Sequence, residues 1–190
     1  MDLRNLAVKV LWLLVCVIAV PAAAQDVQKT LIFSPWTKFC LKNPDDPNAK
    51  QVCFTNKEAY TGPGAAAVAV VLIEPEGEQR KILRVTLPLG MQLILGTRLI
   101  IDQDEPLTAP YVLCIAQGCI ADYEATPDMI AKMKKGQQLN VQAAHATAQP
   151  INLPLPLADF AKAYDGAPTD PKNLAEQQQK LQAELAHRAQ

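Results

Sequence analysis

The most reactive side chains in this sequence belong to two pairs of cysteines. Cys114 and Cys119 stand five positions apart in the stretch "PYVLCIAQGCIADYEA", and Cys40 and Cys53 flank the loop sequence "NPDDPN". Cysteines in such pairs can ligate zinc, exchange thiols and disulfides, or form structural disulfides. Each of these uses requires different neighbouring residues or motifs, so the rest of the sequence can distinguish between them.

The sequence lacks the additional ligands of a zinc site and the cysteine spacing of a redox centre. Structural zinc sites pair cysteines two to four residues apart and need four ligands, whereas twelve residues lie between Cys40 and Cys53 and the two histidines form no HExxH or HxH motif. A redox pair is typically C-x-x-C at the start of a helix, but four residues with strand-like flanks separate Cys114 from Cys119. We therefore expect no metal, no cofactor and no redox activity.

The N-terminus indicates which compartment the cysteines occupy. It carries the basic residues Arg4 and Lys9, an uncharged apolar run from Val10 to Val20, and small residues ending at Ala24. This pattern is typical of a secretory signal peptide cleaved after Ala24. The competing interpretation is a retained membrane anchor, but the run is shorter than the roughly 20 apolar residues that span a bilayer. We expect export into an oxidising compartment.

Export favours structural disulfides. Cleavage removes the fifth cysteine, Cys16, and leaves an even number, which in an exported chain predicts two disulfides. Three pairings are possible, and proximity in the sequence favours Cys40–Cys53 and Cys114–Cys119, each closing a local turn. On the chain-entropy model the first stabilises the fold by about 3 kcal/mol and the second by about 2 kcal/mol.

The acidic residues that could serve as a catalytic acid and base gather near the second cysteine pair. They are Asp102, Asp104, Glu105, Asp122 and Glu124. An enzyme using them, for example through Asp102 and Glu124, needs two to converge in one site, and surface charge at strand ends explains them equally well. The only serine, Ser34, has no nucleophile-elbow context, and no GxGxxG or P-loop occurs. We predict that the protein is not an enzyme.

The charge balance argues against nucleic acid as a partner. The full chain has 18 basic and 19 acidic residues, and removal of residues 1–24 leaves 16 and 18. A formal charge near −2 supplies neither the basic face that nucleic acid requires nor a polybasic membrane signal.

Most of the mature sequence has the pattern of β-strands. Short apolar runs such as "AAAVAVVLI" and the alternating "RKILRVTL" are separated by the turn sequences "TGPG" and "EPEGEQ". In "MQLILGTRLIID", Gly96 predicts a bulge or bend between two short strands. The stretch "QQLNVQAAHATAQPINLPLPL" predicts two more strands, with His145 facing solvent in one of them. Strands at this spacing favour a sandwich or barrel.

Helices are expected at three places. In "TPDMIAKMKKG", Thr126 as N-cap, Pro127 at the first position and a terminal Gly136 agree on one helix. A helix of one or two turns is expected in "ADFAKAYDG". After Asp170, "PKNLAEQQQKLQAELAHRAQ" predicts a C-terminal helix.

The C-terminal helix has one narrow apolar face, formed by Leu174, Leu181 and Leu185. The stripe is too short for a stable coiled coil, and isolated helices of this length are marginal in water. Two interpretations stay open: a solvated tail, or a helix that docks on a partner or on the domain itself. The three leucines are therefore our candidates for partner binding.

One ordered series of motifs resembles a known family. Trp36, Cys40 and Cys53 are followed by "LRVTLPLGMQLILGTRLIID", "APYVLCIAQGCIAD", the capped helix and "INLPLPLADFAKAY". The series is similar to the invasion-associated locus B family of exported alphaproteobacterial proteins. The resemblance implies a mainly β, immunoglobulin-like antiparallel sandwich in the periplasm or envelope, with the four cysteines in a structural role and no catalytic residues.

These observations combine into three segments and two hypotheses. We expect a signal peptide at 1–24, a β-sandwich domain at 25–168 and a helical extension at 169–190. The leading hypothesis is a non-enzymatic periplasmic protein that binds a protein or envelope partner, in one form as an accessory subunit of a membrane complex. Membrane association would then arise through the partner or an uncleaved signal segment. The alternative is a carrier of a small molecule or lipid that uses a cleft between the sheets.

Overall fold

The computed structural model describes residues 31–188 except residues 47 and 65. The expected signal peptide at 1–24 lies outside the described residues. Within the described part, no helix combines the length and the apolar character that a membrane crossing requires.

The first of two sheets has seven strands. Its order is β1-β3-β4-β5-β9-β8, with β2 also paired to β3, and every pairing is antiparallel. The strands are β1 (Ile32–Phe33), β2 (Thr37–Leu41), β3 (Val52–Tyr60), β4 (Val68–Pro75), β5 (Ile82–Leu87), β8 (Tyr111–Ile115) and β9 (Gly118–Glu124).

The second sheet has four strands in the order β11-β10-β6-β7, again all antiparallel. They are β6 (Thr97–Ile101), β7 (Leu107–Ala109), β10 (Gln138–Ala144) and β11 (Pro150–Pro156). The expected alternation in "RKILRVTL" is confirmed, because Leu83, Val85 and Leu87 are buried while Arg84 and Thr86 are only partly covered.

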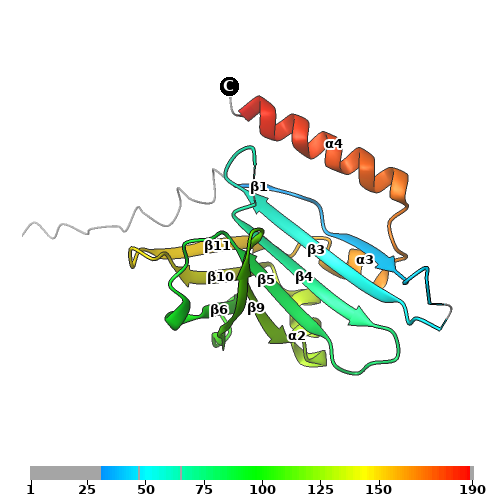
Figure 1. The fold of residues 1–190 in the computed structure, drawn as a ribbon, viewed down its shortest axis with the longest axis horizontal. Coiled ribbons are helices and arrows are strands. Elements are labelled where there is room, and N and C mark those ends of the chain that lie inside the picture. The colour runs from blue at the N-terminus through cyan, green and yellow to red at the C-terminus, as the bar shows by residue number, and fades with distance from the viewer. Residues whose placement is uncertain (1–30, 47, 65, 189–190) are drawn as a thin grey trace, which may run out of the picture.

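Figure 1 shows how the two sheets are arranged, and one core of buried side chains joins them. Fully buried side chains of the first sheet share it with fully buried side chains of the second. They are Val70, Leu72, Leu83 and Val85 from the first sheet and Leu139, Val141 and Leu155 from the second. Burial of each such side chain stabilises the fold by about 1.5–3 kcal/mol. The mainly β, two-sheet architecture expected from the sequence is confirmed.

Three helices surround the sheets. In α2 (Pro127–Lys135) the Thr126 hydroxyl accepts a hydrogen bond from the Met129 N–H at 3.2 Å, so the predicted N-cap is confirmed. The helix α3 (Phe160–Asp165) starts with a fully buried Phe160. The helix α4 (Pro171–Arg188) lies above β1 and β3 in the view of Figure 1.

The prediction of two short strands in "MQLILGTRLIID" is half wrong. Only Thr97–Ile101 forms a strand, while Leu93–Leu95 forms a 3-10 helix, η2, whose side chains are all exposed. Gly96 makes the bend with φ of 63°, and a Cβ there would lie 2.5 Å from the Ala109 carbonyl oxygen. An apolar run resembles a buried strand in sequence, but no neighbouring strand pairs with this one.

Candidate binding cleft

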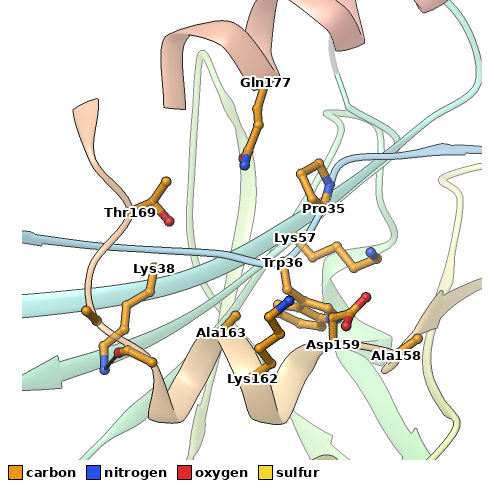
Figure 2. A pocket seen from close by; sticks show the side chains of 12 residues that line it. Pro35, Trp36, Lys38, Lys57, Ala158, Asp159, Lys162, Ala163, Thr169 and Gln177 are labelled. Atoms are coloured by element: carbon orange, nitrogen blue, oxygen red, sulfur yellow. Dashed lines mark hydrogen bonds between the residues drawn. The ribbon is translucent and has the colours of Figure 1, made fainter. Parts of the chain in front are cut away.

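A cleft of about 470 Å³ lies among β2, β3, α3 and the segment that leads into α4 (Figure 2). Its lining combines an aromatic ring, three lysines and one carboxylate. These groups are Trp36, Lys38, Lys57, Lys162 and Asp159. The cleft lies outside the space between the two sheets, which is filled by core side chains.

Trp36 joins the cleft to the core. The indole N–H donates to the Pro156 carbonyl at 2.9 Å, and the ring meets Phe160 edge to face with centroids 4.9 Å apart. Because Trp36 is only 7% exposed, its ring is held rigidly. It therefore provides a fixed wall against which a ligand group can rest.

Lys57 is the most unusual residue of the cleft. It lies on β3 and is only 6% exposed, although lysine is almost never buried without a partner. Its Nζ donates to the Ser34 carbonyl at 2.8 Å and lies over the rings of Trp36 and Phe33, at 5.6 and 5.8 Å from their centroids. Burial lowers the pKa of Lys57 to about 8, partly offset by the charge of Asp159.

The other charged groups leave the cleft positive. Lys38 donates to the carbonyl oxygens of Tyr164 at 2.7 Å and Gly166 at 3.4 Å, which fixes the end of α3 against β2. Lys162 and Asp159 stand exposed at the rim, and Asp159 has a left-handed backbone with φ of 65°. Three cations and one anion make this a place where a carboxylate or phosphate is attracted.

The sequence contains one indication of this cleft, a lysine at position 57 within a strand, which the strand pattern alone does not identify as buried. In β3, Thr55, Lys57 and Ala59 are all buried, so they share the inward face at strand spacing. A lysine on the buried face of a strand is a candidate functional residue. Which face of β3 is buried follows from its pairing with β4, and the sequence does not specify that pairing.

Both expected disulfides are present in the structure. Cys40 is bonded to Cys53 across β2 and β3, and Cys114 to Cys119 across β8 and β9, with Cα atoms 4.0 Å apart in each case. Both bonds link directly opposite residues of a hairpin. Two structural disulfides fit an exported protein. No cluster of three or more His, Cys, Asp or Glu side chains suited to a metal ion occurs among the described residues.

The structure places the acidic candidates in separate structural roles. Asp102 follows β6, and its Oδ1 accepts the N–H groups of Gln137 and Gln138 at 2.9 Å each. Asp122 forms a two-pronged ion pair with Arg84, at 2.8 Å for each hydrogen bond.

The remaining acidic candidates lie at the surface. Asp104 pairs with Lys132 at 3.0 Å, and Glu105 and Glu124 are exposed. His145 forms an isolated β-bridge with Met91 just beyond β10 and is half-exposed, not within the strand itself.

Two of the three leucines on α4 pack on the domain itself. Leu181 is 8% exposed and Leu185 is fully buried, both in a cluster with Ile32 and Tyr60, while Leu174 is half-buried. The Thr169 N–H also donates to the Lys38 carbonyl at 2.7 Å at the approach to the helix. Of the two interpretations of the tail, the structure favours docking on the domain over a solvated helix. A partner would reach Leu181 and Leu185 only if α4 moved away.

Comparisons with known proteins agree with this architecture. The chain is 24% identical over 148 residues to an invasion protein B homolog of Brucella abortus (strain 2308). The alignment covers 77% of this chain and 82% of that protein. A homolog from Brucella abortus biovar 1 (strain 9-941) matches with the same identity and coverage. The fold resembles the crystal structure of invasion associated protein B from Bartonella henselae, with a TM-score of 0.60 and 20% identity, covering 70% of this chain and 90% of that one. The family model for the invasion associated locus B protein matches residues 36–168. The chain therefore belongs to the invasion associated locus B family.

Proposed function

We propose that this protein is a non-enzymatic periplasmic binding protein whose cleft receives a carboxylate of a protein partner in the cell envelope. The observation that supports this proposal is the buried Lys57 on a rigid aromatic wall. Its ammonium group has three N–H donors, and one of them is used by the Ser34 carbonyl. The cleft thus offers a preorganised cation for an acidic side chain or a C-terminal carboxylate.

The chemistry of the lining supports binding over catalysis. The cleft residues include no histidine, cysteine or serine, and its only carboxylate, Asp159, stands at the rim beside cations. Catalysis that uses serine, cysteine or histidine therefore has no residue to act through in this lining. The same residues suit ligand recognition, because the fixed ring of Trp36 can select for the shape of a ligand and the desolvated ammonium of Lys57 for its negative charge.

The carrier hypothesis has less support. It requires an apolar cleft between the sheets, and core side chains occupy that space in the described part of the chain. The cleft found instead is open and charged, and it lies at the β2–β3 edge of the first sheet, on the face that carries Lys57.

Crosslinking in intact cells followed by mass spectrometry tests the proposal. We expect one specific envelope protein to be captured through residues that line the cleft. In Lys57→Met the yield should fall about tenfold, since a hydrogen bond to a charged group contributes about 1.5–3 kcal/mol. Lys180→Met, on the exposed side of α4, is the matched control and should leave the yield unchanged.

Two outcomes would contradict the proposal: capture of no specific protein, or capture that persists in Lys57→Met. Thermal unfolding of both variants verifies that the domain remains folded.

A further inference from the structure

A second surface, unrelated to the cleft, carries an unusual concentration of exposed aliphatic side chains. Ile94 at the tip of η2 is 96% exposed, and its neighbours Leu93 and Leu95 are 51% and 63% exposed. Further exposed side chains come from the preceding loop and from the edge strand β8. We call the whole set the aliphatic patch: Leu89, Leu93, Ile94, Leu95, Val112, Leu113 and Ile115.

Backbone contacts bring these segments to one end of the molecule. Gly118, the first residue of β9, lies so close to Leu87 that a Cβ would collide with the Leu87 carbonyl oxygen. Gly96 approaches Ala109 and Pro110, just before β8. The chain between Leu87 and η2 is tied to the β10–β11 hairpin, because the Ala146 N–H donates to Gly90 at 2.7 Å and the Gln92 N–H donates to Ala144 at 2.8 Å. In Figure 1 this hairpin and the chain leading to β6 lie at the left end.

The segments that build this end carry no carboxylate. The sequence has no charged residue in 106–121 or 59–73, only Arg98 in 85–101 and only His145 as a titratable group in 136–158. Arg98 lies beside Leu95 along the same shallow groove. Charged residues of α4 approach Tyr60 nearby, but Glu184 and Arg188 pair with each other at 2.9 Å. Apart from these α4 side chains and Glu58, which accepts a hydrogen bond from the Tyr60 hydroxyl, the segments that build this end carry few charges.

The shape of the tip favours a fluid partner over a folded one. A side chain that is 96% exposed has almost no neighbours, so a protein partner would need a pocket that encloses it. Interface hot spots are also rich in Trp, Tyr and Arg, whereas the large apolar side chains exposed in the described part of the chain are all aliphatic. Acyl chains conform to any protruding shape and need no pocket.

The backbone at the tip is suited to a weakly polar medium. The Leu95 N–H donates to the Gln92 carbonyl at 3.3 Å, and the Gly96 N–H donates to the Leu93 carbonyl at 3.2 Å. A turn whose polar groups are paired internally costs less to place among lipid headgroups than an open loop.

The chain also enters the domain at this end. The strand pairings trace one end of the first sheet from β1 to β9. At this end Ile32 of β1 pairs with Tyr60 of β3, and Leu87 of β5 pairs with Cys119 of β9. Between them the pairs are Ala59 with Val68 and Ala69 with Thr86. The predicted signal segment at 1–24 therefore precedes a domain whose first described residue, Leu31, lies at the patch end of the first sheet.

We propose that the aliphatic patch docks this protein directly on a lipid bilayer surface, with η2 inserted at the level of the headgroups and Arg98 facing anionic lipid. Peripheral proteins bind in this way by burying an apolar face about 5–10 Å into the boundary between headgroups and acyl chains. The surface is distinct from the Lys57 cleft, so the domain can hold lipid at one end and a partner at the cleft.

Vesicle flotation with the purified exported protein tests this proposal. We expect it to float with vesicles of phosphatidylcholine that contain phosphatidylglycerol, and more weakly with phosphatidylcholine alone. Ile94→Asp should lower the partition coefficient about tenfold or more, because it places a charge where the proposal inserts an aliphatic side chain into the bilayer. Ile94→Trp should keep binding and shift its fluorescence emission to shorter wavelength on vesicles.

Leu41→Asp is the matched control. Leu41 is an exposed leucine, at 59%, but it lies at the opposite end of the first sheet, where it pairs with Val52 and Val52 pairs with Pro75. This variant should float like the unaltered protein.

Three results would overturn the lipid assignment. The first is no flotation with either vesicle composition, and the second is an equal loss in Ile94→Asp and Leu41→Asp. The third is a dimer in lipid-free solution that Ile94→Asp dissociates, which would make the patch a contact between two copies. None of these depends on the cleft, because Lys57→Met should bind vesicles normally.

Discussion

At the scale of single residues, Lys57 occupies an unfavourable position for a charged side chain. A charged ammonium on the buried face of β3 loses hydration, and among the described residues it regains one hydrogen bond, the faces of two rings and the attraction of Asp159. Replacing it with an apolar side chain of similar length would remove that desolvation cost. Its position in a cleft is consistent with a ligand that supplies further negative charge.

The lowered pKa of Lys57 predicts how stability depends on pH. Its pKa is about 8 in the folded protein and 10.5 in the unfolded chain, so the unfolded state binds more protons between these values and stability rises with pH across that window. Lys57→Met should be more stable than the unaltered protein at pH 7, by up to about 3 kcal/mol, and the difference should shrink by about pH 9.5.

Urea denaturation at the two pH values measures this difference. Lys180→Met controls for general effects of removing a lysine. A difference between Lys57→Met and the unaltered protein that stays constant over this pH range would contradict the assignment of the lowered pKa.

At the scale of elements, α4 is held by few contacts compared with the strands. Leu181 and Leu185 pack on Ile32 and Tyr60, while most of the other residues of the helix are exposed. A helix of this length is marginal without such packing. We therefore expect α4 to detach at a lower free energy than the sheets unfold, since local openings reflect local burial.

Leu185→Asp should release α4 while the sheets stay folded. A carboxylate cannot be buried unpaired beside Ile32 and Tyr60, so amide hydrogen exchange within Pro171–Arg188 should become at least about tenfold faster. Exchange in β3, β4 and β5 should not change. Gln182→Asp, on the exposed face, is the control. Global loss of protection in Leu185→Asp would instead mean that α4 is integral to the core.

At the scale of the whole molecule, one core makes the two sheets a single cooperative unit. Leu72 from the first sheet and Leu139 from the second are both fully buried in the same cluster. The disulfides each bridge two neighbouring strands within the first sheet, so they reinforce hairpins and do not connect the sheets. The sheets are held together by hydrophobic packing and by polar contacts such as the 2.6 Å hydrogen bond between the Thr97 and Tyr123 hydroxyls.

Leu72→Ala and Leu139→Ala should each lower the free energy of unfolding by about 2–5 kcal/mol, because each leaves a cavity in a close-packed core. Both variants should still unfold in one transition, seen at the same urea concentration by tryptophan fluorescence and circular dichroism. Leu41→Ala, at an exposed site, should change stability by no more than about 0.5 kcal/mol. Separate transitions for the two sheets would contradict a shared core.

Local patterns determined much of this protein. The spacing of Cys114 and Cys119, the alternation around Leu83 and the cap at Thr126 each depend on neighbouring residues, so hairpins, strands and α2 could be predicted from the sequence. The family motifs extended this to the two-sheet fold.

Only the tertiary structure determines which faces of those elements are exposed to solvent and which pack against other elements. "LIL" at 93–95 has the pattern of a buried strand, yet it lies exposed because no strand pairs with it. Lys57 looks like an ordinary charged residue, yet α3 and Trp36 enclose it. The physical reason is that hydrophobicity and charge are properties of a residue, whereas burial depends on distant segments that sequence spacing does not specify.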